Sequence, residues 1–177
     1  MQDKSLEGEE TAMKASADSP SVDYLLRMLD EGYSKKSWHG PNLKGSLRGI
    51  NHRAAAWRLG KNRHNIWEIV IHAAYWKYVV RRRLLGEKRG SFEVTGSNWI
   101  VRPDELTEEA WKSDLRILER SHQELRKTVA GLEEDNLVVT PGGSQFSNES
   151  LIRGVAFHDI YHAGQIQLLK RLMRNPS

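Results

Sequence analysis

The chain of 177 residues contains no cysteine. This absence excludes disulfide bonds, thiolate metal sites and a cysteine nucleophile, so any metal must be bound through nitrogen or oxygen. The sequence also lacks a run of 18 apolar residues, because its most hydrophobic stretch, IVIHAAYWKYVV, is interrupted by His72 and Lys77. We therefore expect no transmembrane helix and no membrane partner.

The N-terminal segment lacks the basic start and apolar block of a signal peptide, so we expect a cytoplasmic protein. Residues 1–20 hold two lysines and five acidic residues, a net charge of −3. Because the whole chain has a net charge of +4, the remaining residues carry +7. We expect residues 1–18, which contain no aromatic residue, to form a flexible tail. With 38% hydrophobic residues and six Trp in the chain, residues 19–175 suit one folded domain.

Four stretches have apolar residues at helical spacing. Each follows a side chain that commonly caps a helix N-terminus: Ser19, Asn65, Thr107, and Ser147 or Asn148. Gly86 and Gly131 predict where the second and third helices end. Four long amphipathic helices in one domain predict an all-α fold, a four-helix bundle.

The connections after helix one (residues 34–65) and after helix two (residues 86–106) are long. The first contains four Gly and one Pro, and we predict one or two short helical turns within it. Since long loops in compact domains are often functional, we expect both connections to form pocket walls. In the third connection, the segment NLVVT (residues 136–140) is predicted to form a short extended piece.

The histidines of the predicted helices suggest a metal site. His158 and His162 are four residues apart, which places both imidazoles on one helix face within an apolar stripe. His72 lies on the apolar stripe of the second helix. Three nitrogen ligands leave open positions on a metal, as in catalytic sites. We predict that His72, His158 and His162 bind a divalent metal; the alternative is that they are core histidines satisfied by carbonyl or carboxylate groups.

For other polar residues of these helices, the sequence gives weaker evidence of a role in the site. Asp159 is a candidate to orient an imidazole, or to form a salt bridge with an arginine. Gln165, one turn after His162, either supports that imidazole or has a packing role. No catalytic side chain is assigned; Glu68, Asp159 and Tyr161 are general acid or base candidates by position only. Surface roles are expected for the remaining histidines, which are His39, His52, His64 and His122.

A basic cluster follows the second predicted helix: Arg81, Arg82, Arg83, Lys88 and Arg89. Basic residues at a helix C-terminus suit the helix dipole, so we interpret the cluster as a solvated face. A nucleic-acid binder remains a third hypothesis, which predicts salt-dependent binding to DNA. The sequence contains no DNA-reading motif, and we expect no nucleic-acid partner.

The fourth predicted helix carries the motif H-x-x-x-H-x-G-Q-I, which here comprises His158, His162, Gly164, Gln165 and Ile166, and an earlier helix has a single histidine, His72. With this motif the chain resembles the DinB-like (DinB/YfiT-like) family. The resemblance implies an up-down-down-up bundle, a three-histidine site for a divalent metal, and a homodimer. Relatives include S-transferases that use bacillithiol and an isomerase that uses mycothiol.

Residue pattern and resemblance together lead to our main hypothesis, a metal-dependent transferase or hydrolase. A divalent metal, with Zn²⁺ or Ni²⁺ as first choices and Mn²⁺ or Fe²⁺ next, would activate a low-molecular-weight thiol or water for attack on a small electrophilic substrate. The alternative is a metal-binding stress-response bundle or dimeric interaction module without catalysis. A metal site that small molecules can reach favours the enzyme, and one sealed by Trp57 or Trp76 favours the alternative.

Overall fold

The computed structural model describes residues 19–90 and 92–174, and all regular secondary structure in these residues is helical. The predicted flexible tail, residues 1–18, lies outside the described residues. Four of the helices are long and three are short. They are α2 (Pro20–Tyr33), α3 (Leu43–Ser46), α4 (His52–Ala56), α5 (Ile66–Leu84), α6 (Glu108–Ala130), α7 (Glu134–Leu137) and α8 (Asn148–Arg174).

The long helices begin where their capping residues predict. The side chains of Ser19, Asn65 and Thr107 each accept a hydrogen bond from a backbone N–H in the first turn of α2, α5 and α6, respectively. At α5 the cap is reciprocal, because Glu68 also accepts from the backbone N–H of Asn65. These bonds satisfy donors that have no partner within the helix.

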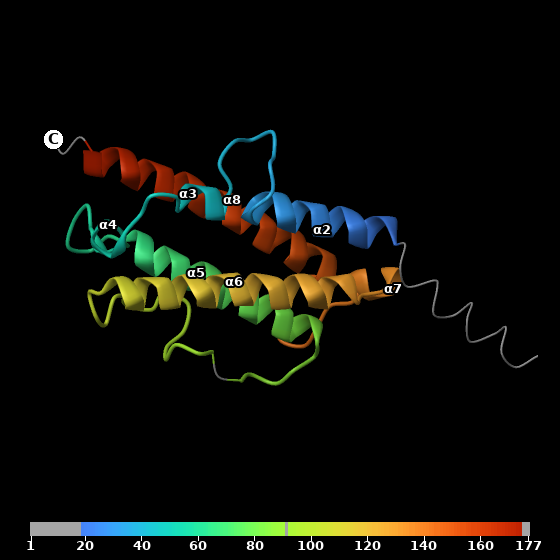
Figure 1. The fold of residues 1–177 in the computed structure, drawn as a ribbon. Coiled ribbons are helices and arrows are strands. Elements are labelled where there is room, and N and C mark those ends of the chain that lie inside the picture. The colour runs from blue at the N-terminus through green and yellow to red at the C-terminus, as the bar shows by residue number, and fades with distance from the viewer. Residues whose placement is uncertain (1–18, 91, 175–177) are drawn as a thin grey trace, which may run out of the picture.

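The long helices lie side by side, with α8 packed against α2 and α5, and α5 against α6 (Figure 1). One apolar core gathers around Trp67 of α5 and Trp111 of α6, whose rings meet edge to face at 5.2 Å. A second core joins α2, the N-terminal half of α8 and the C-terminal half of α6. α2 and α8 approach closely at Gly32, where an added Cβ would lie 2.7 Å from the Ala156 carbonyl oxygen.

The connections differ in content. The one between α2 and α5 contains α3 and α4, which confirms the predicted short helical turns. The extended piece predicted at residues 136–140 is wrong: Asn136 and Leu137 belong to α7, and the described residues contain no strand. Glu133 and Asn136 cap that short helix, so local side-chain hydrogen bonds outweigh the β propensity of the two valines that follow. None of the described helices has the length and apolar character needed to span a bilayer.

Candidate metal centre

Three histidine side chains converge between α5 and α8. His72 comes from α5, and His158 and His162 come from successive turns of α8. Nε2 of His158 lies 3.0 Å from Nε2 of His72 and 3.0 Å from Nε2 of His162. One ring nitrogen from each residue lies within 4.8 Å of the others, so the group could hold a metal ion. The sequence thus identified all three residues that the structure brings together.

The opposite ring nitrogens of two of these histidines have acceptors. Nδ1 of His72 is 3.0 Å from the carbonyl oxygen of Asn98, and Nδ1 of His162 is 2.6 Å from Oε1 of Gln165. The Gln165 amide is oriented in turn, because its Nε2 donates to the hydroxyl of Tyr161 at 2.9 Å. Acceptors at Nδ1 keep the proton there, so Nε2 of each neutral ring presents a lone pair to the centre.

The environment keeps the three imidazoles neutral. Burial lowers the pKa of His158 to about 3, with a further contribution from its two histidine neighbours, and lowers the pKa of His162 to about 4. Burial also lowers the pKa of His72. One proton on Nε2 of His158 can satisfy only one of its two short N···N contacts. A cation that accepts three lone pairs satisfies all of them, so the donor set fits a divalent metal.

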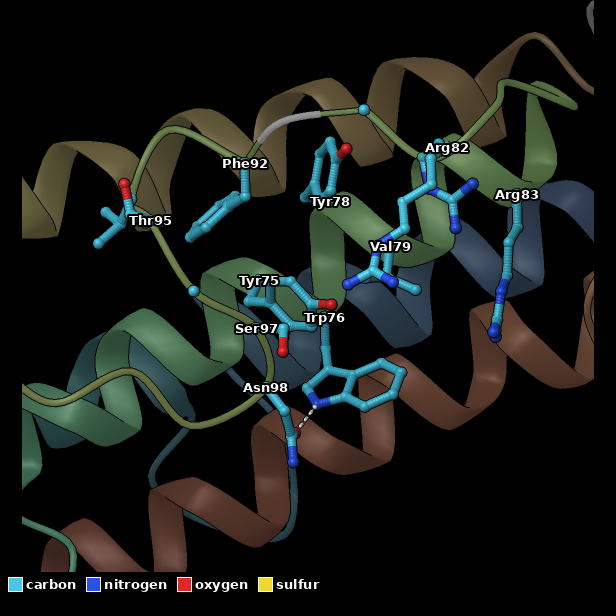
Figure 2. A pocket seen from close by; sticks show the side chains of 14 residues that line it. Tyr75, Trp76, Tyr78, Val79, Arg82, Arg83, Phe92, Thr95, Ser97 and Asn98 are labelled. Carbon is cyan, nitrogen blue, oxygen red and sulfur yellow. Dashed lines mark hydrogen bonds between the residues drawn. The ribbon is translucent and has the colours of Figure 1, made fainter.

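Residues 98 and 99 of the connection between α5 and α6 cover His72. Trp99 stacks on the His72 ring at 3.8 Å, and His64 stacks on Trp99 at 3.7 Å. Asn98 has a φ of 58°, a left-handed conformation that Asn adopts more readily than most residues. Its side-chain oxygen also accepts from the indole N–H of Trp76 at 3.0 Å (Figure 2). Both the backbone and the side chain of Asn98 therefore support the centre, which the sequence did not predict.

Arg102 anchors this covering segment. Its guanidinium makes a bidentate contact with Asp114 of α6, at 2.7 and 2.8 Å. Its carbonyl oxygen accepts from the side chain of Asn65, at the start of α5. Bidentate Arg–carboxylate contacts are directional, and the Asp114 side chain is buried. The segment that orients His72 is thus fixed to both helices.

A cavity of about 540 Å³ reaches the centre. His72 and His158 form part of its wall, and most of the other lining residues are apolar: Trp76, Val80, Phe146, Leu151, Gly154 and Val155, with Arg83, Asn98 and Ser150. The second connection contributes to the wall as expected, through Asn98. The first connection does not contribute to it; the connection between α6 and α8 does, through Phe146.

Asp159 does not have the role expected of it. Its carboxylate pairs with the ammonium group of Lys77, and both side chains are completely buried. The expected partners were an imidazole or an arginine, but Asp159 faces the interior beside α5, where Lys77 supplies the charge that a buried carboxylate needs. Glu68, Asp159 and Tyr161 are all absent from the wall of the cavity.

The remaining histidines are mostly outside the core, with one exception. His39 and His64 are exposed, and His52 is half-buried beside Glu108, 2.9 Å away. The surface role expected for His122 is wrong: its ring is buried and stacks on Tyr33 at 3.9 Å. Its charged sequence neighbours hid this, although the spacing of His122 from the apolar residues Leu118, Leu125 and Val129 places it on the buried face.

One protein family matches most of the chain. A family described as the DinB superfamily matches residues 37–166, a range that includes all three histidines and Gln165. The chain belongs to the DinB superfamily. No curated protein and no solved structure matches the chain. The DinB match begins after α2 and ends within α8, so the connections that surround the centre lie inside it.

Proposed function

We propose that this DinB superfamily member is a metal-dependent enzyme in which His72, His158 and His162 bind a divalent metal, with Zn²⁺ or Ni²⁺ as first choices and Mn²⁺ or Fe²⁺ next. The observation that carries the proposal is the convergence of three neutral Nε2 atoms, two of them with Nδ1 hydrogen-bonded behind. Three protein ligands leave a position for a small molecule. A bound divalent metal supplies Lewis acidity, which lowers the pKa of a water or thiol in that position.

The chain's own residues have three roles in this proposal. Asn98 and Gln165 hold the His72 and His162 rings in the tautomer that directs Nε2 to the metal. Trp99 stacks on one face of His72 and limits water there. The apolar cavity wall receives the substrate and keeps a nucleophile formed beside it away from bulk water.

We propose the reaction class by combining the family with the cavity: a low-molecular-weight thiol or a water attacks a small electrophilic substrate, as in an S-transferase or hydrolase. The cavity beside His72 and His158 favours this over a metal-binding module without turnover, because a small molecule can approach the centre. Trp76 lies in the wall of that cavity, beside both histidines. The homodimer and the cytoplasmic location stay predictions.

We also propose the up-down-down-up order for the four long helices. In Figure 1 the colour gradient runs in the same direction along α2 and α8 and in the opposite direction along α5 and α6, which supports this order. The contacts of α8 with both α2 and α5 are compatible with it. This arrangement would bring His72 and His158 together from antiparallel helices.

Cobalt substitution tests the proposed function. The metal-free protein is loaded with Co²⁺, and its visible and near-ultraviolet absorption is followed while a small thiol is added. We expect thiol-to-cobalt charge-transfer bands that depend on His158, followed by thiol-dependent loss of an electrophilic aryl halide or epoxide probe. A cobalt spectrum that thiols and other small ligands leave unchanged, together with no turnover, would favour the module without catalysis.

A further inference from the structure

A second cavity, of about 630 Å³, adjoins the first one (Figure 2). It lies between α5 and the segment that follows this helix, and shares Trp76, Arg83 and Asn98 with the cavity at His72 and His158. Its lining combines aromatic rings with arginines: Tyr75, Trp76, Tyr78, Phe92, Arg82, Arg83 and Arg89 among others. The two cavities are therefore neighbours, and these three residues belong to the walls of both.

The described part of the chain does not offset the charge of the three arginines in this lining. Among the described residues, no carboxylate forms an ion pair with Arg82, Arg83 or Arg89, and no acidic side chain is part of the wall. Arg81, next in sequence, differs: its guanidinium lies 3.5 Å from a Glu87 carboxylate oxygen and 3.6 Å from one of Glu124. Within the described residues, the arginine outside the cavity has carboxylate partners and those inside it have none, which leaves their charge available to an anion.

Some polar atoms in this wall are buried and lack a hydrogen-bond partner among the described residues. The Nε atoms of Arg82 and Arg83 and the hydroxyl of Tyr78 are buried and form no hydrogen bond with described residues. Among the described residues, the Nη atoms of the two arginines donate only to backbone carbonyls, those of Glu87 and Gly143. Buried donors without acceptors are costly, and an anionic oxygen is the acceptor that suits a guanidinium best. Figure 2 shows Arg82 and Arg83 near one end of the cavity and Phe92 nearer the other.

We propose that this cavity binds the anionic group of the substrate or thiol: a carboxylate or phosphate held by Arg82, Arg83 and Arg89, with an aromatic or apolar body against Tyr75 and Phe92. The assignment to a substrate rests on the proposed function, whereas anion binding itself does not require the metal. The substrate class is thus a small anion whose reactive end reaches past Trp76 to His72 and His158. Under this proposal, three arginines of the basic cluster, which we interpreted from the sequence as a solvated face, line a binding site.

Calorimetric titration of the full chain with three probes tests the proposal. Benzoate and phenylphosphonate carry the two anionic groups, and benzamide is the neutral analogue of benzoate. We expect an anion to bind and benzamide to bind at least about tenfold more weakly. Arg82→Gln and the exposed Arg89→Gln should each weaken anion binding by about tenfold. Arg81→Gln, the matched control, should leave it within about twofold.

The outcomes separate this proposal from the metal site. Anion binding that persists in metal-free protein and in His158→Ala supports the subsite even if no metal binds. Tighter binding of phenylphosphonate would identify the anionic group as a phosphate, and tighter binding of benzoate would identify it as a carboxylate. Both results support an anion-binding cavity. The proposal is overturned if benzamide binds as tightly as benzoate, if Arg81→Gln weakens binding as much as Arg82→Gln, or if neither anion gives a heat of binding at millimolar concentration.

Discussion

Two buried polar clusters lie next to each other between α5 and α8. The three-histidine cluster consists of His72, His158 and His162. The lysine–aspartate cluster consists of Lys77 and Asp159, with Tyr33 and His122 packed beside them. Both clusters take residues from α8, where Asp159 lies between His158 and His162 in the sequence.

The two clusters differ in how their polar groups are matched. Lys77 and Asp159 are opposite charges in direct contact, and the Lys77 ammonium lies 5.2 Å from the centre of the Tyr33 ring. The three histidines are all neutral imidazoles, and their Nε2 atoms face one another. The lysine–aspartate pair supplies both partners of its own contact, while Oδ1 of Asp159 and Nδ1 of His122 are buried without a hydrogen-bond partner among the described residues. The histidine cluster lacks a donor for at least one of its two short N···N contacts, which a bound cation would complete, and this difference separates an ion pair within the chain from a candidate binding site.

Breaking the lysine–aspartate cluster should have the largest effect on stability. Lys77→Met leaves the Asp159 carboxylate buried without its partner, and we expect a loss of about 3–5 kcal/mol in the free energy of unfolding, measured in urea. The double variant Lys77→Met, Asp159→Leu should recover most of this loss, because both charges are gone. A single variant as stable as the wild type would mean that the pair is not buried as described.

Metal addition should act on the other cluster alone. At a Zn²⁺ concentration about 100 times the dissociation constant, binding stabilises the folded state by about 2.7 kcal/mol. The double variant at Lys77 and Asp159 should gain the same increment, and His158→Ala should gain none. Equal gains in the wild type and in His158→Ala would place the bound metal elsewhere.

Loss of Gln165 should weaken metal binding without destroying the site. Its Oε1 accepts from Nδ1 of His162, and groups that orient a ligand in this way are typically worth 10–100-fold in metal affinity. We expect Gln165→Ala to raise the dissociation constant by about this factor in a competition titration with a chromophoric chelator. Gln167→Ala, on the same helix, is the control and should match the wild type.

His122 should make a smaller, pH-dependent contribution. Burial lowers its pKa to about 3, whereas the unfolded chain binds this proton near pH 6.5. Stability therefore falls as the pH drops below about 6.5, until the folded state also binds the proton near pH 3. In metal-free protein, His122→Phe should make this decline shallower by up to about 1.4 kcal/mol per pH unit. Parallel stability curves for the two proteins would show that His122 titrates normally.

Much of the framework could be predicted because its signals are local. Capping by Ser19, Asn65 and Thr107 depends on residues within one turn, so it can be read from the sequence. The three histidines were also readable, since each lies on the apolar face of a helix. The family match covers all three positions.

The rest depends on contacts between distant segments. The bond from His72 to the Asn98 carbonyl spans 26 residues and requires a loop conformation that no short motif specifies. The pairing of Lys77 with Asp159 depends on the register of α5 against α8. The role proposed for the basic cluster depends on such contacts too, because the chain segment that follows α5 places Arg82 and Arg89 in the wall of one cavity.

The most direct test of the central claim is the metal content of protein purified without a histidine tag, measured by plasma mass spectrometry. We predict close to one equivalent of a transition metal in the wild type and in His122→Phe, and almost none in His72→Ala or His158→Ala. Wild-type protein without metal, and without a thermal shift on addition of Zn²⁺, Ni²⁺ or Mn²⁺, would contradict the assignment of the three-histidine cluster as a metal centre.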